Sequence, residues 1–147
     1  MKETTLPKST QTGWLLLFAA CIVAMIATLG SLFFSEVIAV PICKLCWYQR
    51  VALYPLVVIL ALSLFPYNPG IVRTAGVFVA VGWLITLFHL LLIAGLIPEN
   101  VQPCVQGVPC SETHLSLLGF LNIPALSLLT FSVIGVLLYF THRIESS

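Results

Sequence analysis

Four long apolar stretches constrain this chain more than any other feature of its sequence. A helix that crosses a bilayer needs about 17–25 consecutive apolar residues, and inside lipid each backbone group must be paired within its own segment. The alternating pattern of a membrane β-barrel is absent. We therefore predict an all-α membrane protein, a four-transmembrane-helix bundle that forms one domain over residues 1–147. The expected helices are residues 14–34, about 47–65, about 75–97 and about 115–140.

The composition supports a membrane environment and excludes several functions. Only 7% of the residues are charged and 60% are hydrophobic, whereas a soluble domain carries about 25% charged residues. A net charge of +1 is too small to predict a nucleic-acid partner. A secretory signal has an apolar core of about 7–15 residues, and the first stretch is longer, so we expect it to be a retained helix.

The basic residues predict how the bundle is oriented. Cytoplasmic segments of membrane proteins carry an excess of Lys and Arg, and placing both termini and the FPYNPG turn (residues 65–70) inside leaves more basic residues inside than outside. We therefore expect a multi-pass membrane protein with N- and C-termini cytoplasmic. The connections at residues 35–46 and 98–114 would be extracytoplasmic. The inner basic residues are Lys2, Lys8, Arg73 and Arg143, and the outer ones are Lys44 and Arg50.

Five cysteines divide into one single residue and two pairs. Cys21 lies within the first apolar stretch, where an inert buried thiol is expected. The pairs, Cys43 with Cys46 and Cys104 with Cys110, both fall on the predicted outer face, where disulfides persist. We expect no metal, because the second spacing exceeds that of usual zinc ligands. Structural disulfides and redox catalysis both remain open.

The segment CKLCWYQR favours catalysis. A disulfide between residues three apart closes a very small ring, so it stabilises a fold poorly, but either sulfur can resolve a mixed disulfide on the other. A helix N-terminus favours thiolate, and Lys44 and Arg50 add positive charge. Helical spacing at i, i+3 and i+7 would place Cys43, Cys46 and Arg50 on one face.

Electrons taken up by this pair need an acceptor. The sequence has no dinucleotide-binding or haem-attachment motif, so a membrane-soluble quinone is the carrier that fits a small helical bundle. Arg50 would then hydrogen-bond a quinone carbonyl, with a snorkelling interfacial arginine as the alternative. His89 is a second candidate, because an ionisable residue inside a membrane is commonly functional. Its alternative is a hydrogen bond to another helix.

Four segments together resemble the DsbB family of disulfide-bond formation proteins, and most closely its Gram-positive branch, BdbC. They are LGSLFFSE (29–36), CKLCWYQR (43–50), PCVQGVPCS (103–111) and GFLNIP (119–124). The resemblance implies a multi-pass thiol–quinone oxidoreductase of the bacterial cell membrane that supports disulfide formation in secreted proteins. Its partner would be a DsbA-like (BdbD-type) thioredoxin-fold thiol oxidase outside the membrane, and its electron acceptor a quinone, with menaquinone expected from the Gram-positive branch.

The resemblance also implies a role for each candidate residue. Cys104 would form the mixed disulfide with the partner, Cys43 would exchange with Cys110, and Cys46 would lie beside the quinone. Arg50 and His89 would assist there. The five-residue loop between Cys104 and Cys110 is shorter than in proteobacterial members, and Lys44 is not a motif residue.

Two alternatives from other classes remain. One is an enzyme resembling the vitamin K epoxide reductases, in which the C-x-x-C motif lies late in the chain rather than early. The other is a non-enzymatic tetraspan protein with two structural disulfides. Structural disulfides have reduction potentials below about −300 mV, so a potential measurement distinguishes them from a catalytic pair.

Overall fold

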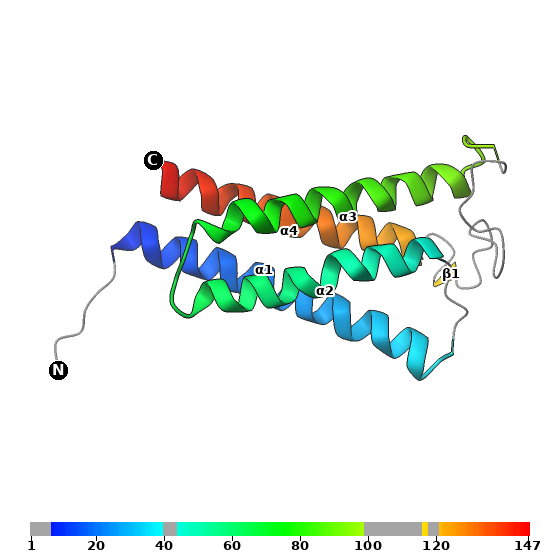
Figure 1. Ribbon diagram of the computed structural model, residues 1–147, viewed down its shortest axis with the longest axis horizontal. Helices are drawn as coiled ribbons and strands as arrows, with labels where there is room; N and C mark the ends of the chain where they lie inside the picture. The colour runs from blue at the N-terminus through cyan, green and yellow to red at the C-terminus, as the bar shows by residue number, and fades with distance from the viewer. Residues whose placement is uncertain (1–6, 40–43, 99–115, 118–120) are drawn as a thin grey trace.

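The computed structural model describes residues 7–39, 44–98, 116–117 and 121–147, and it is a bundle of long helices (Figure 1). Each helix is long and apolar enough to cross a membrane, which confirms the predicted all-α class. The helices are α1 (Lys8–Glu36), α2 (Lys44–Leu64), α3 (Ile71–Ile93) and α4 (Ile123–Ser146).

Helix α4 begins later than the apolar stretch at about 115–140 suggested. Residues Ser116–Leu117 (β1) instead pair antiparallel with Leu121–Asn122 (β2). Pro124 is the second residue of α4, a position where its missing N–H costs no helical hydrogen bond. The proline therefore marks the start of the helix rather than a kink within it.

Helix α3 spans Ile71–Ile93 rather than about 75–97, so it begins and ends earlier than its apolar stretch. Gly95 has a φ of +76°, a left-handed conformation that glycine adopts without strain and that commonly follows the last turn of a helix. The apolar residues that follow therefore lie outside the helix.

The interior of the bundle is apolar and includes small residues where helices approach closely. Leu17, Leu56 and Ile134 are fully buried, and Gly82 on α3 lies against the ring of Phe131 on α4. Small residues allow membrane helices to pack closely. Large apolar side chains such as Leu29 and Leu62 are exposed on the outside, as a lipid environment favours.

The α2–α3 turn packs against both terminal helices. The hydroxyl of Tyr67 donates to Glu145 Oε1 at 2.6 Å, and the rings of Trp14 and Phe65 meet edge to face with centroids 6.4 Å apart. The start of α1, this turn and the end of α4 thus share one end of the bundle (Figure 1). The first turn of α2 lies at the other end.

Candidate functional site

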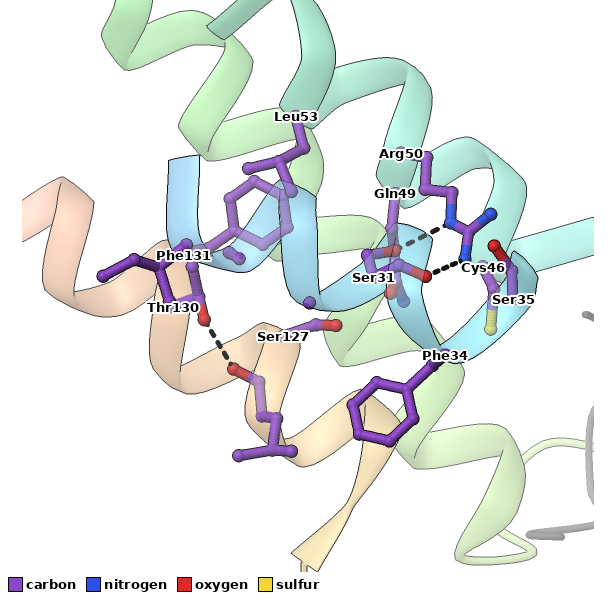
Figure 2. Close-up of a pocket in the computed structure, with 14 residues that line it drawn as sticks. Ser31, Phe34, Ser35, Cys46, Gln49, Arg50, Leu53, Ser127, Thr130 and Phe131 are labelled. Atoms are coloured by element: carbon purple, nitrogen blue, oxygen red, sulfur yellow. Dashed lines mark hydrogen bonds between the residues drawn. The ribbon is translucent and has the colours of Figure 1, made fainter. Parts of the chain in front are cut away.

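A cavity of about 320 Å³ lies between α1, α2 and α4, next to the first turns of α2 (Figure 2). Its walls are mostly apolar, with several polar side chains among them, which is the usual character of a small-molecule site of about 300–1,000 Å³. The apolar lining residues are Ile26, Ala27, Gly30, Phe34, Leu53, Leu126 and Phe131, and the others are Ser31, Ser35, Cys46, Gln49, Arg50, Ser127 and Thr130.

Arg50 is turned inward to α1. Its side chain is 8% exposed, its Nε donates to Ser31 Oγ at 2.8 Å, and its Nη2 donates to the main-chain oxygen of Ser31 at 2.6 Å. Figure 2 shows both bonds. Neither acceptor carries a charge, so these bonds leave the positive charge of Arg50 in place beside the cavity. The guanidinium also lies 5.9 Å from the ring centroid of Trp47, within cation–π range.

This arrangement differs from that of a snorkelling arginine. A snorkelling side chain extends its charge to the interface, whereas the guanidinium of Arg50 is buried and fixed by a neighbouring helix. The adjacent aromatic residues differ from it, because Trp47 and Tyr48 are 54% and 52% exposed. These two aromatic residues therefore face outward, in keeping with an interfacial position.

Cys46 is the third residue of α2 and lines the same cavity as Arg50. The two residues are four apart, which places them on one face of the helix, one turn from each other. The structure thus brings together the thiol and the cation that the spacing predicted would share a face. Cys43, Cys104 and Cys110 lie outside the described residues, so their roles remain predictions.

His89 lies deep in the bundle, behind the cavity. Its side chain is 2% exposed, and its Nδ1 is 3.3 Å from the amide nitrogen of Gln49. Gln49 lines the cavity and His89 does not. Because an amide nitrogen only donates, Nδ1 is the acceptor of this contact, which links His89 to a residue that lines the cavity.

Several polar residues of this site were not identified from the sequence. Ser31, Gln49, Ser127 and Thr130 all line the cavity, and each is a polar residue inside an apolar helix. That position was the available signal, since polar groups within a membrane span mostly face the protein interior. Cys21, by contrast, is buried in the core away from the cavity, as predicted.

The comparisons with known proteins agree with one another on a single family. The family model described as "Disulfide bond formation protein DsbB" matches residues 10–141. The chain is 38% identical over 138 residues to a "Probable disulfide formation protein" of Metapseudomonas resinovorans, covering 93% of this chain and 96% of that one. It is 41% identical over 129 residues to "Probable disulfide formation protein C 2" of Bacillus cereus (86% and 92% covered).

A third relative is "Disulfide bond formation protein C" of Bacillus subtilis, which is 40% identical over 120 residues and is matched over 80% of this chain and 86% of its own. No solved structure matches the chain significantly. The similarity to all three relatives extends over most of their length.

Proposed function

Because the chain belongs to the family of the disulfide bond formation protein DsbB, we propose that it is a membrane thiol–disulfide oxidoreductase that reoxidises an extracytoplasmic, DsbA-like thiol oxidase and passes the electrons to a membrane quinone. The observation that carries the proposal is the shared cavity of Cys46 and the buried Arg50. It places a redox-capable sulfur and a fixed positive charge beside space for a small ligand.

The proposed orientation has the Cys46 end of the bundle facing outward. The start of α1, the end of α4 and the α2–α3 turn lie together at the opposite end, where Arg73 and Arg143 also lie. An excess of basic residues favours the cytoplasmic side. Cys46 would then be in the compartment where disulfides persist.

The proposed thiol exchange balances in electrons and protons, and re-forming the Cys43–Cys46 disulfide afterwards requires a two-electron, two-proton acceptor, which is the proposed quinone. The two thiols of the partner lose two electrons and two protons as their disulfide forms, and a disulfide of this chain, Cys104–Cys110, is reduced to two thiols. Exchange with a Cys43–Cys46 disulfide, by thiolate attack on sulfur, then moves the same two electrons to Cys43 and Cys46. The division of roles follows the family pattern given above.

The cavity fits a quinone ring. A quinone presents an apolar ring with two carbonyl acceptors, and the cavity offers apolar walls with N–H donors from Arg50 and Gln49. A quinone bound there would supply a two-electron oxidant next to Cys46. Arg50 favours negative charge at that point, and the apolar walls exclude water, which strengthens this electrostatic effect.

We propose menaquinone as the quinone, although the matched relatives come from Metapseudomonas as well as Bacillus. A naphthoquinone and a benzoquinone should therefore be tested side by side.

The decisive experiment uses the full chain purified in detergent. Reduced DsbA-like partner is added together with quinone, and partner oxidation and quinone reduction are followed in parallel. We expect equal molar amounts of both with the unmodified protein, and with Cys46→Ser no quinone reduction and no partner oxidation beyond a single turnover. Absence of turnover, with disulfide potentials below about −300 mV, would instead support a tetraspan protein with structural disulfides. Reduction of vitamin K epoxide by a dithiol would support the epoxide reductase alternative, which the family match disfavours.

A further inference from the structure

Ser31 makes two contacts with Arg50 that engage one complete edge of the guanidinium. The Nε–H bonds to the Ser31 hydroxyl oxygen at 2.8 Å, and the Nη2 of the same edge bonds to the Ser31 carbonyl oxygen at 2.6 Å. A planar group held at two points along one edge has a fixed plane and a fixed direction. A single residue of α1 therefore determines how a cation of α2 is presented.

The rest of the guanidinium carries the N–H donors that Ser31 does not use. A guanidinium carries five N–H donors, and Ser31 accepts from two of them. The remaining donors, on Nη1 and Nη2, keep a fixed direction because the plane is fixed. Arg50 lines the cavity, and these donors are the ones that its bonds to Ser31 leave for a ligand carbonyl.

Neighbouring hydroxyls of α1 behave differently. Thr28 Oγ1 donates to the Ala24 carbonyl at 2.8 Å, and Ser35 Oγ donates to the Leu32 carbonyl at 3.1 Å. Such bonds to the helix's own backbone are the usual arrangement for Ser and Thr inside helices. Ser31 instead uses its hydroxyl oxygen to accept from a cation of another helix.

We propose that Ser31 is the positioning residue for Arg50, and that quinone affinity depends on Ser31 through the guanidinium. The proposal rests on the proposed function, in which Arg50 binds a quinone carbonyl. Without the Ser31 hydroxyl, one of the two fixed points is lost, and the long arginine side chain regains rotamer freedom. The remaining hydrogen bond, from Nη2 to the main-chain oxygen of Ser31, does not by itself fix the plane of the guanidinium.

The test measures binding rather than turnover. Quenching of tryptophan fluorescence gives the dissociation constant of a short-tailed naphthoquinone for the purified, full-length protein. We expect Ser31→Ala to raise that constant on the order of tenfold, since it removes one hydrogen bond to a charged group. Ser31→Thr should bind nearly as well as the unmodified protein, and its isostere Ser31→Val should resemble Ser31→Ala. The Thr and Val variants keep the test decisive if Ser31→Ala folds poorly.

Thr28→Ala is the matched control, because it removes a hydroxyl from the same helix that bonds only within that helix and lies outside the cavity. Its dissociation constant should equal that of the unmodified protein. Tm without quinone, measured for every variant, separates binding from stability.

A second comparison shows whether Ser31 acts through Arg50. In an Arg50→Met background, which has no donor to position, adding Ser31→Ala should change the dissociation constant less than about twofold, because coupled residues are not additive. An equal loss in both backgrounds, or no loss with Ser31→Ala alone, would overturn the positioning role. If the unmodified protein binds no quinone while it still oxidises the partner in a single turnover, the proposed electron acceptor is wrong, and the role of Ser31 falls with it.

Discussion

The imidazole Nδ1 of His89 and the amide nitrogen of Gln49 lie 3.3 Å apart, and only the glutamine lines the cavity. A ligand in the cavity would therefore meet Gln49, whose amide contacts His89 of α3. An amide group carries a donor nitrogen and an acceptor oxygen. The contact with His89 turns the nitrogen of the Gln49 amide toward the imidazole ring.

The first prediction concerns this pair. Gln49→Leu removes a polar contact of the cavity and should raise the quinone dissociation constant about 5- to 10-fold, within the range for one hydrogen bond. His89→Leu should have a smaller effect of the same sign. The double variant should be no worse than Gln49→Leu alone, as measured by fluorescence quenching. If the fold-increase in the dissociation constant of the double variant equals the product of the two single fold-increases, His89 contacts the ligand independently of Gln49.

The second prediction concerns Arg50 and electron transfer. Arg50→Lys keeps the charge but loses the planar fork, so the apparent KM for quinone should rise, while Arg50→Gln should be worse. A hydrogen bond to a charged group contributes about 1.5–3 kcal/mol, which corresponds to about 10- to 100-fold. Steady-state quinone reduction against quinone concentration measures this change.

Oxidation of the partner in a single turnover is the control for Arg50. That step precedes any need for quinone, so it should persist in both variants. Identical quinone dependence in all three proteins would exclude Arg50 from the binding site.

The third prediction tests the packing behind the cavity. A Cβ at position 82 would overlap the ring of Phe131, which is 2% exposed and lines the cavity. Gly82→Ala should therefore destabilise the bundle by about 1–3 kcal/mol and weaken quinone binding by moving the ring. Gly76→Ala is the control on the same helix, because a Cβ there meets nothing within 4 Å. Thermal unfolding and quinone titration of both variants provide the comparison.

The fourth prediction concerns the fifth cysteine. Cys21 is 4% exposed and packs in the apolar core, where a thiol behaves as a small hydrophobe. Cys21→Ala should leave turnover within about twofold of the unmodified protein and lower stability slightly, because a small cavity forms. Loss of quinone reduction at normal expression and unchanged Tm would mean that Cys21 takes part in the redox chemistry.

The fifth prediction tests orientation in intact cells. After mild reduction, a membrane-impermeant thiol reagent should label Cys104 or Cys110, and Cys21 should stay unlabelled. Labelling of the pair that requires permeabilised cells would reverse the proposed topology. Mass spectrometry of the purified protein identifies the labelled residue.

The helices were predictable because the length of an apolar stretch is a local property. The limits of α3 and α4 were less predictable, since they depend on Gly95 and Pro124, whose conformations override the apolar pattern. The shared face of Cys46 and Arg50 was also predictable, because residues four apart on one helix lie one turn from each other.

The contacts between helices could not be predicted in this way. Ser31 and Arg50 are 19 residues apart in the sequence, and Gln49 and His89 are 40 residues apart. Such pairs meet only when the rotation and depth of two helices are both fixed, and a hydropathy pattern specifies neither quantity. The sequence therefore identified Arg50 and His89 as candidates without identifying the residues that hold them.

The contact of Tyr67 with Glu145 lies beside Gly13 of α1, and it is a point about which α1 could tilt. A Cβ at Gly13 would meet Glu145 Oε1 at 2.9 Å, so α1 packs closely against the α2–α3 turn and α4 at this point. Gly13 and Ser31 are about 27 Å apart along α1, at about 1.5 Å per residue. A tilt of α1 by about two degrees around Gly13 would shift Ser31 by about 1 Å, enough to break a hydrogen bond of ordinary length. The hydrogen bonds between Ser31 and Arg50 therefore depend strongly on the tilt of α1.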